Sequence, residues 1–347
     1  MKSVIITSIN HPTRAILEIG QVCERKGLSC IVIGDEKSPR DFFAEGCSFY
    51  SIEAQLNSGL RFADACPTRH YARKNIGYLL AIRNGVTTIL ETDDDNIPLS
   101  NFWEDRSALV KASSLNGTGW TNVYKYFSEH LIWPRGLPLD EVNAPLPEYE
   151  TLPAEEFFCP IQQGLADDNP DVDAIYRLLL PLPIKFRTDR SLVLKNNTWC
   201  PFNSQNTSWW TEAYPLLYLP SFCSFRMTDI WRSLIAQRIL WLNDWYVLFH
   251  EPTVFQERNE HNLMRDFEDE ISGYLNNRKI ADALMELPLR VGEVNISDNL
   301  RICYEKLVQI HVMQKEELML LDLWLDDLSS ITDHRHRNLT PQTLTNG

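Results

Sequence analysis

The sequence predicts an α/β protein in which a mostly parallel, doubly wound sheet is flanked by helices and followed by a helical extension at the carboxyl end. Short apolar runs alternate with helical patterns in the front part of the chain, and this alternation is typical of βαβ units. Helical periodicity returns after Asp229 and continues through residues 298–328. The chain of 347 residues is 44% hydrophobic and has 10 tryptophans, so it can form a substantial core in one large domain or two ordinary ones.

The elements of the front part follow one another in a regular order. Three apolar runs rich in β-branched residues are predicted as buried strands: residues 4–9, 30–33 and 86–90. A helix between the first two strands carries its apolar residues on its inner side: Ile16, Leu17, Ile19 and Val22. A second helix over residues 72–83 precedes the third strand, and Gly85 provides its carboxyl cap. Doubly wound sheets bind ligands at the carboxyl ends of their strands, so we expect the functional residues there.

Residues 97–225 differ from the rest because they are rich in proline, tryptophan and asparagine and show little periodicity. Such segments form ordered loops that build substrate pockets on a rigid sheet. We therefore predict a catalytic domain over residues 1–275, with a nucleotide-binding half (1–96) and an acceptor-binding, catalytic half (97–275). A helical extension (276–331) and a flexible tail (332–347) complete the chain.

The net charge of −14 argues against a nucleic-acid-binding protein, because neutralising phosphates needs clustered lysine and arginine. It also disfavours broad electrostatic attachment to anionic membranes. No apolar segment of 18 residues occurs, and the first apolar run is too short for a signal peptide. The 8 cysteines are scattered without a Cys-x-x-Cys pair, which is not a zinc pattern. We expect a cytoplasmic protein with free thiols; peripheral contact with the inner face of the membrane is an alternative.

Three consecutive aspartates follow the third predicted strand. Asp93 and Asp95 are alternate residues, so in extended backbone their side chains leave on the same face, with Asp94 on the opposite one. Two hard oxygen ligands held together suit Mg²⁺ or Mn²⁺, which in turn binds a diphosphate. The sequence therefore predicts a divalent-metal site here, and an acidic turn or a helix cap is the alternative interpretation.

A basic cluster precedes the aspartates at the start of the second helix. Arg73 and Lys74, followed by Asn75, provide charge and backbone donors for a phosphate or a ribose. Asp35 follows the second predicted strand and can accept a hydrogen bond from a ribose hydroxyl or from a base N–H. We assign these residues and Asp94 to nucleotide binding. A solvated helix start and a loop aspartate without a ligand are the alternatives.

A further carboxylate, Asp229, lies at the start of a later predicted helix. It is the candidate general base for an acceptor hydroxyl, with Arg232 one turn later holding its geometry or meeting a phosphate. The structural alternative is that Thr228 or Asp229 caps the helix. His261 is a candidate third metal ligand, although a lone histidine is more often a surface or hydrogen-bonded residue.

The segment 164–173 is unusually acidic, and within it only Asp171 and Asp173 could present a second pair of carboxylates. We favour sugar-hydroxyl binding by this loop, or a helix start at Asp173, over a second metal site. Residues 201–207 place amides before Trp209 and Trp210. This combination suits a carbohydrate surface or a polar turn over a tryptophan-rich core.

Short motifs recur in a fixed order over roughly residues 3–275: 32–39, 72–77, 91–96, 132–136, 164–177, 201–207 and 229–232. In these motifs the chain resembles the STELLO glycosyltransferase-like family. The resemblance implies a GT-A-like fold for a nucleotide sugar, with Asp93 and Asp95 as the metal-binding pair. Plant members carry an amino-terminal membrane anchor, and some assemble and traffic cellulose synthase complexes. This chain begins at its first strand, so we expect a free-standing enzyme.

These observations predict a glycosyltransferase that uses Mn²⁺ or Mg²⁺ to move a sugar from a nucleotide sugar, a UDP-sugar by expectation, to an acceptor hydroxyl. The acceptor would be a glycan or a lipid-linked glycan in surface glycan or polysaccharide synthesis. A nucleotide-sugar mutase or nucleotidyltransferase on the same fold is one alternative, and a non-catalytic interaction protein is another. The exposed faces of the carboxyl-terminal helices could support a homodimer.

Overall fold

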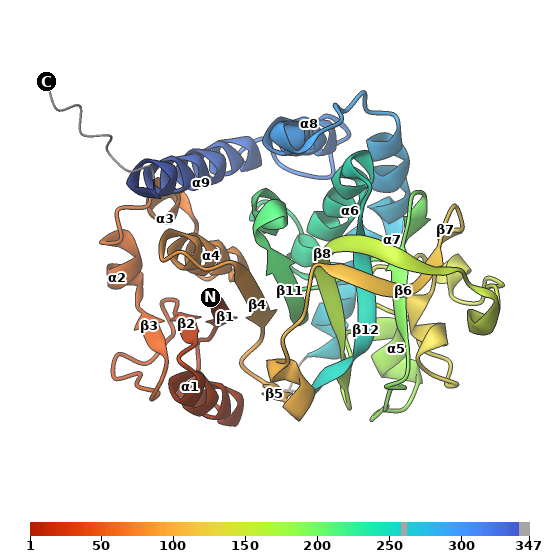
Figure 1. The fold of residues 1–347 in the computed structure, drawn as a ribbon, viewed down its shortest axis with the longest axis horizontal. Helices are drawn as coiled ribbons and strands as arrows, with labels where there is room; N and C mark the ends of the chain where they lie inside the picture. The colour runs from red at the N-terminus through yellow and green to blue at the C-terminus, as the bar shows by residue number, and fades with distance from the viewer. Residues whose placement is uncertain (258–261, 340–347) are drawn as a thin grey trace, which may run out of the picture.

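A computed structural model describes residues 1–257 and 262–339 of the chain. The strands are β1 (Lys2–Thr7), β2 (Ser29–Ile33), β3 (Ser48–Tyr50), β4 (Thr88–Thr92), β5 (Asn96–Pro98), β6 (Leu109–Leu115), β7 (Gly119–Trp120), β8 (Ala154–Asp167), β9 (Ser191–Leu194), β10 (Thr198–Trp199), β11 (Asn206–Trp210) and β12 (Trp245–Gln256). The helices are α1 (Arg14–Lys26), α2 (Ile52–Leu56), α3 (Arg61–Ala65), α4 (Lys74–Arg83), α5 (Ala174–Leu179), α6 (Thr228–Leu240), α7 (Leu263–Met285), α8 (Ile296–Gln309) and α9 (Glu317–Leu339). Figure 1 shows a mixed α/β structure with one large sheet flanked by helices.

Within the described residues, ten strands form this sheet in the order β3-β2-β1-β4-β11-β8-β6-β9-β12-β5. The first four strands of that order are parallel, because β1 pairs in parallel with both β2 and β4, and β2 with β3. From β11 onward the pairings are mixed: β11 runs antiparallel to β4 and to β8, whereas β8 and β12 are parallel. The predicted parallel sheet is therefore found in the front half only.

Alternating side chains of β1 enter two different cores, as expected for a strand covered on both faces. Val4 and Ile6 pack with residues of α1, whereas Ile5 packs with residues of α4. Gly77 of α4 permits this close approach, since a Cβ there would lie 2.7 Å from the Ile5 Cγ2 atom. The resulting α/β/α layers fix the carboxyl ends of β1, β2 and β4 at one edge.

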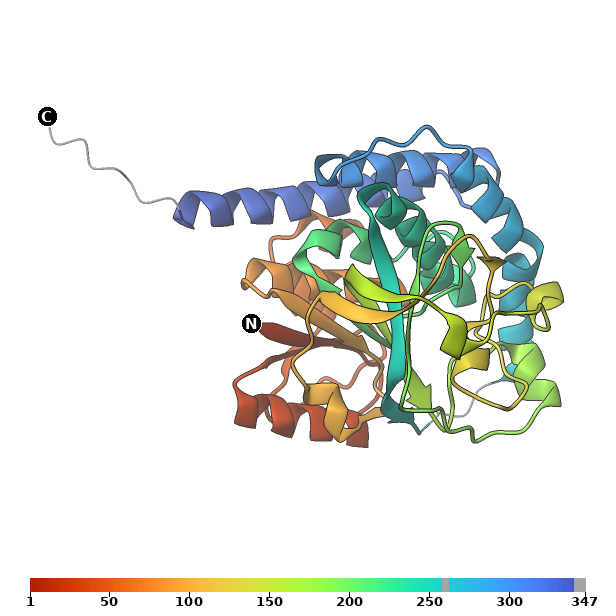
Figure 2. The ribbon, with the colours of Figure 1, turned by 45° about the vertical axis from the view of Figure 1, so that its right-hand side comes forward.

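The carboxyl-terminal helices are part of the main core. Leu320, Leu321 and Trp324 of α9 are fully buried in the same hydrophobic cluster as α4 and α6. Buried Glu317 accepts hydrogen bonds from the backbone N–H groups of Ser221 and Phe222, at 2.9 and 2.6 Å. Figures 1 and 2 show α8 and α9 lying across one side of the molecule, over α4 and α6.

Several predicted elements are confirmed and others are wrong. The three front strands, the two front helices and the helices after residue 228 are present, although Leu17, predicted inward, is 42% exposed. The loops predicted over residues 97–225 instead include β6, β8, β9 and β11. Buried glutamines and the absence of apolar alternation in β8 hide this strand from a periodicity argument.

The predicted boundaries do not coincide with breaks between elements. The boundary between residues 275 and 276 falls inside α7, and the start of the predicted tail at residue 332 falls inside α9. His261 and residues 340–347 lie outside the described residues. None of the helices in residues 1–257 and 262–339 has the length and hydropathy of a transmembrane span.

Shortening Leu321 to alanine tests whether α9 belongs to the main core. Because the side chain is fully buried, we expect Leu321→Ala to lower the free energy of unfolding by about 2–5 kcal/mol. Urea denaturation should still show a single transition. The matched control is Met319→Ala on the same helix, where the side chain is 57% exposed and the expected change is within about 0.5 kcal/mol. A separate early transition in Leu321→Ala would show instead that the helices unfold as an independent extension.

Candidate functional site

A cavity of about 620 Å³ opens at the carboxyl ends of β1, β2 and β4. Open α/β sheets bind ligands at this edge, where the strand order reverses. The front half of the chain lines the cavity with the ends of β1 and β2, the turn after β4, residues 69–71 and Arg73. The second half contributes Arg135, Asp171, Arg177, Ser204, Gln205, Phe225, Arg226, Asp229 and Gln256.

The three aspartates form a turn between β4 and β5, and all three line the cavity. The prediction that Asp94 faces away from Asp93 and Asp95 is therefore wrong. It assumed extended backbone, but β4 ends at Thr92 and the chain turns before β5 begins at Asn96. In a turn, neighbouring side chains no longer alternate between two faces.

Asp94 attaches this turn to the end of β1. Its carboxylate accepts hydrogen bonds from the Ser8 hydroxyl at 2.5 Å and the Asn10 amide at 3.1 Å, and its backbone carbonyl accepts one from the Thr13 hydroxyl. Because these contacts cross from β4 to β1, they hold the turn at the point where the strand order reverses. Asp94 thus positions the turn from within the cavity wall.

Lys74 and Tyr71 hold the Asp93 carboxylate in place. The Lys74 ammonium lies 3.2 Å from the Asp93 carboxylate and also donates to the Thr92 carbonyl and the Tyr71 hydroxyl, both at 2.8 Å. Burial raises the pKa of Asp93 to about 7, against the opposing charge of Lys74 and with a further rise from Asp95 and Asp94. The carboxylate is therefore poorly stabilised as an anion and would gain from a cation beside it.

A divalent cation at the aspartate turn would have few protein ligands. Asp93 and Asp95 both line the cavity, and Gln256 donates to both carboxylate oxygens of Asp95 at 3.1 Å. Among residues 1–257 and 262–339, no group of three or more His, Cys, Asp or Glu side chains could hold an ion. Mg²⁺ commonly takes one or two carboxylates together with substrate phosphates and water, and this pair matches that pattern.

The predicted nucleotide residues Asp35 and Arg73 both line the cavity but are already hydrogen-bonded. Asp35 accepts from the backbone N–H groups of Glu36, Arg69 and His70, at 2.7, 2.8 and 2.9 Å. Arg73 is almost fully buried and donates to the Gln55 side chain and the Cys66 carbonyl. Both residues therefore order the loops at the end of β2.

Two other predicted nucleotide residues do not reach the cavity. Lys74 is fully buried beneath the aspartate turn. Asn75 is also fully buried, and its side-chain amide exchanges two hydrogen bonds with the backbone of Leu219, at 2.8 and 2.9 Å. The sequence placed them on an exposed helix start, but tertiary packing covers α4 on all sides. The structure therefore does not place these two side chains where the predicted nucleotide would bind.

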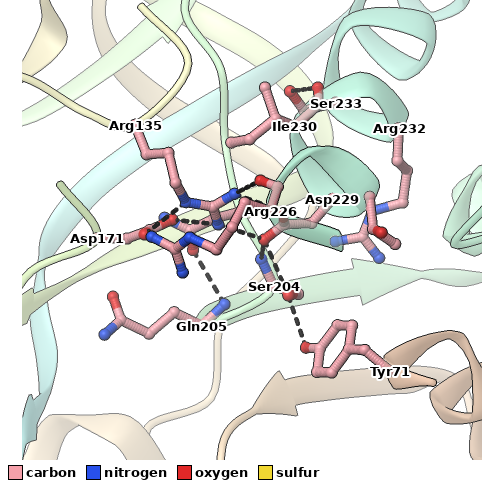
Figure 3. Close-up of polar contacts among 12 residues, drawn as sticks. Tyr71, Arg135, Asp171, Ser204, Gln205, Arg226, Asp229, Ile230, Arg232 and Ser233 are labelled. Carbon is pink, nitrogen blue, oxygen red and sulfur yellow. Dashed lines mark hydrogen bonds and ion pairs between the residues drawn. The ribbon is translucent and has the colours of Figure 1, made fainter. Parts of the chain in front are cut away.

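On the opposite wall, Arg135 lies between two carboxylates (Figure 3). It donates to Asp171 at 2.8 and 2.7 Å and to Asp229 at 3.0 and 2.9 Å. A fifth bond goes to the Arg226 carbonyl, so all five N–H groups of the guanidinium are used. Asp171 therefore belongs to this ion pair, whereas Asp173 caps α5 by accepting from the Tyr176 N–H at 2.8 Å. The helix start predicted at Asp173 is confirmed.

The surroundings of Asp229 do not suit the predicted general base. Burial alone would raise its pKa, but the charge and hydrogen bonds of Arg135, helped by Arg232 and the Ser204 N–H, hold it well below the ordinary value. The Ser204 N–H and hydroxyl both donate to this carboxylate at 3.1 Å. A general base needs a pKa near the working pH. The predicted helix cap is wrong too, because α6 starts without a side-chain cap.

Arg232 faces away from the cavity and binds Glu91 instead. Its two terminal nitrogens lie 3.0 and 3.1 Å from the two Glu91 oxygens, and both side chains are buried. Glu91 also accepts from Trp209 at 2.9 Å and from Tyr78. The predicted role of Arg232 at a phosphate is therefore wrong, although its charge still contributes to the low pKa of Asp229.

Several residues that the structure brings to the cavity were not predicted from the sequence, chiefly Ser8, Asn10, Tyr71, Arg135 and Ser204. Ser8 and Asn10 follow the first strand, and the rule that ligands bind at carboxyl ends could have found them. Arg135 gave no such signal, because its partners are 36 and 94 residues away.

The chain is similar in sequence to proteins of one known family. The family described as STELLO glycosyltransferases matches residues 226–343. "Probable glycosyltransferase STELLO2" of Arabidopsis thaliana is 30% identical over 275 residues, which cover 73% of this chain and 35% of that protein. "Probable glycosyltransferase STELLO1" of the same organism is 28% identical over 274 residues, with the same coverage.

The chain belongs to the STELLO glycosyltransferase-like family, which confirms the family that its motifs predict. It spans about a third of the length of these two relatives. A solved structure, "Crystal Structure of a Mycobacterial Protein", is similar over 80% of this chain and 74% of its own, with 12% identity. Its TM-score with this chain is 0.41.

Replacing Asp93 by asparagine should change how stability depends on pH. The pKa of about 7 in the folded chain exceeds the value of about 3.9 for an unfolded aspartate. The Asp93 contribution to stability is therefore complete below about pH 4 and is lost as the pH rises through 7. We expect the melting temperature of Asp93→Asn, relative to the natural protein, to be higher at pH 8 than at pH 5. Asp168→Asn, outside the cavity, is the control, and an equal difference at both pH values would contradict the assignment.

Removing the Arg135 guanidinium should leave two buried carboxylates without their cation. We expect Arg135→Met to lower the free energy of unfolding by about 3–5 kcal/mol, as for other broken buried ion pairs. The control is Arg61→Met, since that side chain is 65% exposed in its pair with Asp326 and should contribute at most about 1 kcal/mol. The free energy of unfolding of both variants is measured by urea denaturation. An equal decrease in the two variants would show that the Arg135 cluster stabilises the protein no more than an exposed ion pair does.

Proposed function

We propose that this chain is a metal-dependent glycosyltransferase of GT-A-like organisation that moves a sugar from a nucleotide sugar to an acceptor hydroxyl. The observation that carries the proposal is the aspartate turn after β4, which lines a cavity of about 620 Å³ where the strand order reverses. The names of the two Arabidopsis relatives support the class of reaction. The parallel order β3-β2-β1-β4 supports nucleotide binding at this edge.

In this proposal Asp93 and Asp95 hold Mn²⁺ or Mg²⁺, which would stabilise the negative charge of the leaving nucleoside diphosphate. Lys74 and Tyr71 orient Asp93, and Asp94 fixes the turn against β1. Lys37 is an exposed cation of the cavity wall beyond β2. It is the group that we assign to the phosphates in place of Lys74.

The residues around Asp229 fit a positioning role in the same reaction. Its carboxylate accepts four hydrogen bonds from Arg135 and Ser204, so it fixes the wall beside the reacting groups. Arg232 acts further back, since it holds α6 to β4 through Glu91. Asp35 and Arg73 order the loops at the end of β2 that would receive the nucleoside.

Nucleotide binding with Mn²⁺ tests the proposal directly. Isothermal titration calorimetry of the natural protein with UDP, GDP, ADP and CDP should find at least one nucleotide whose affinity rises when Mn²⁺ is present. For that nucleotide, Asp95→Asn should lower the Mn²⁺-dependent affinity by about tenfold or more, because one anionic ligand is lost. Asp168→Asn, an equal change outside the cavity, should bind normally. An Asp95→Asn variant that keeps the full Mn²⁺-dependent affinity for the nucleotide would contradict the assignment of Asp95 as a metal ligand.

Two further outcomes separate the alternative functions. A nucleotide sugar supplied without any acceptor would be isomerised by a mutase, whereas a transferase would at most hydrolyse it slowly. A protein that binds none of these nucleotides with Mn²⁺ would favour a non-catalytic interaction protein.

A further inference from the structure

The wall formed by Arg135, Asp171 and Asp229 offers a ligand an unusual surface. All five N–H groups of Arg135 are engaged by protein oxygens, so the guanidinium cannot donate to a ligand. Arg135, Asp171 and Asp229 all line the cavity, and with the N–H groups used, this cluster can offer a ligand only oxygen acceptors. Such a surface accepts hydrogen bonds and suits a ligand rich in hydroxyl groups.

The two carboxylates differ in how much accepting capacity is left. Asp229 already accepts four hydrogen bonds: one oxygen accepts from Arg135, from the Ser204 N–H and from the Ser204 hydroxyl, and the other accepts from Arg135. Each Asp171 oxygen accepts a single side-chain hydrogen bond, from Arg135. Because an ionised carboxylate has about four acceptor positions, about two remain on Asp171. Arg135 holds them in place with a bidentate pair.

This wall lies next to the proposed diphosphate site. The Tyr71 hydroxyl is 3.2 Å from the Asp93 carboxylate. It is also 2.6 Å from the Ser204 hydroxyl, which in turn lies 3.1 Å from Asp229 (Figure 3). Three contacts thus join the aspartate turn to the Arg135 cluster. In a nucleotide sugar the group attached to the far side of the diphosphate is the sugar. A diphosphate held at Asp93 with its nucleoside toward β2 therefore directs the sugar to this wall.

We propose that Asp171 accepts hydrogen bonds from hydroxyl groups of the transferred sugar and so determines which donor is bound. Arg135 is a positioning residue that holds this carboxylate. Asp171 is buried except where it lines the cavity. A carboxylate in such a place, with acceptor positions still free, strongly prefers a ligand whose hydroxyl group donates a hydrogen bond over a ligand that lacks this hydroxyl. This inference rests on the proposed function, because it needs a nucleotide at the aspartate turn.

The test compares nucleotide sugars with their own nucleoside diphosphates. With Mn²⁺ present, calorimetry measures UDP against UDP-glucose, UDP-galactose and UDP-N-acetylglucosamine, and GDP against GDP-mannose. At least one sugar should bind the natural protein roughly tenfold more tightly than its diphosphate, as one or two hydrogen bonds to a charged group allow. In Asp171→Asn that gain should disappear while the affinity for the diphosphate stays the same. A purely structural defect would weaken both.

The controls keep the result decisive. Asp168→Asn, three residues away and outside the cavity, should retain the sugar gain. A folded Asp171→Asn that keeps the gain would overturn the inference, as would a natural protein whose affinity for every diphosphate is unchanged by the sugar. If Asp171→Asn does not fold, the comparison of diphosphate and sugar affinities in the natural protein can still overturn the inference. If no nucleoside diphosphate binds at all, the proposed function fails instead.

Discussion

The double ion pair of Arg135 with Asp171 and Asp229 is the interaction on which the second half of the cavity depends. It joins three segments far apart in the sequence, at distances of 2.7–3.0 Å. Burying one charge alone would be costly, so these three groups are stable only together. Gly136 makes the arrangement possible, because its φ of +87° suits glycine and a Cβ there would lie 2.5 Å from Ile230.

A second buried ion pair, between Glu91 and Arg232, holds α6, the helix that carries Asp229, to β4 in the first half of the chain. Glu91 comes just before the aspartate turn, and Arg232 comes one turn after Asp229. The two halves of the cavity wall are therefore linked both through the cavity, by Tyr71 and Ser204, and behind it. Buried pairs thus hold both the strand end and the helix start that flank the site, which favours preorganised side chains.

The segment that matches the STELLO family supports this wall from the outside. It covers residues 226–343 and so includes α6, α7, α8 and α9. Buried Glu317 at the start of α9 holds the backbone of Ser221 and Phe222, which lead into the start of α6. In the described part of the chain, α7, α8 and α9 contribute no residue to the cavity wall and support it from behind. From the matched segment the wall takes Arg226, Asp229 and Gln256.

The sequence by itself determined the front strands, the helices between them and the edge at which Asp93 and Asp95 lie, because these follow from local apolar patterns and from the rule for strand ends. It also identified the family. Only the tertiary structure decided that Lys74, Asn75 and Arg232 are buried beneath the wall, that Asp94 faces the cavity, and that Arg135 reaches Asp171 and Asp229. The reason is physical: burial and long-range ion pairs depend on segments that meet only after folding, and no local pattern encodes which charged side chain meets which.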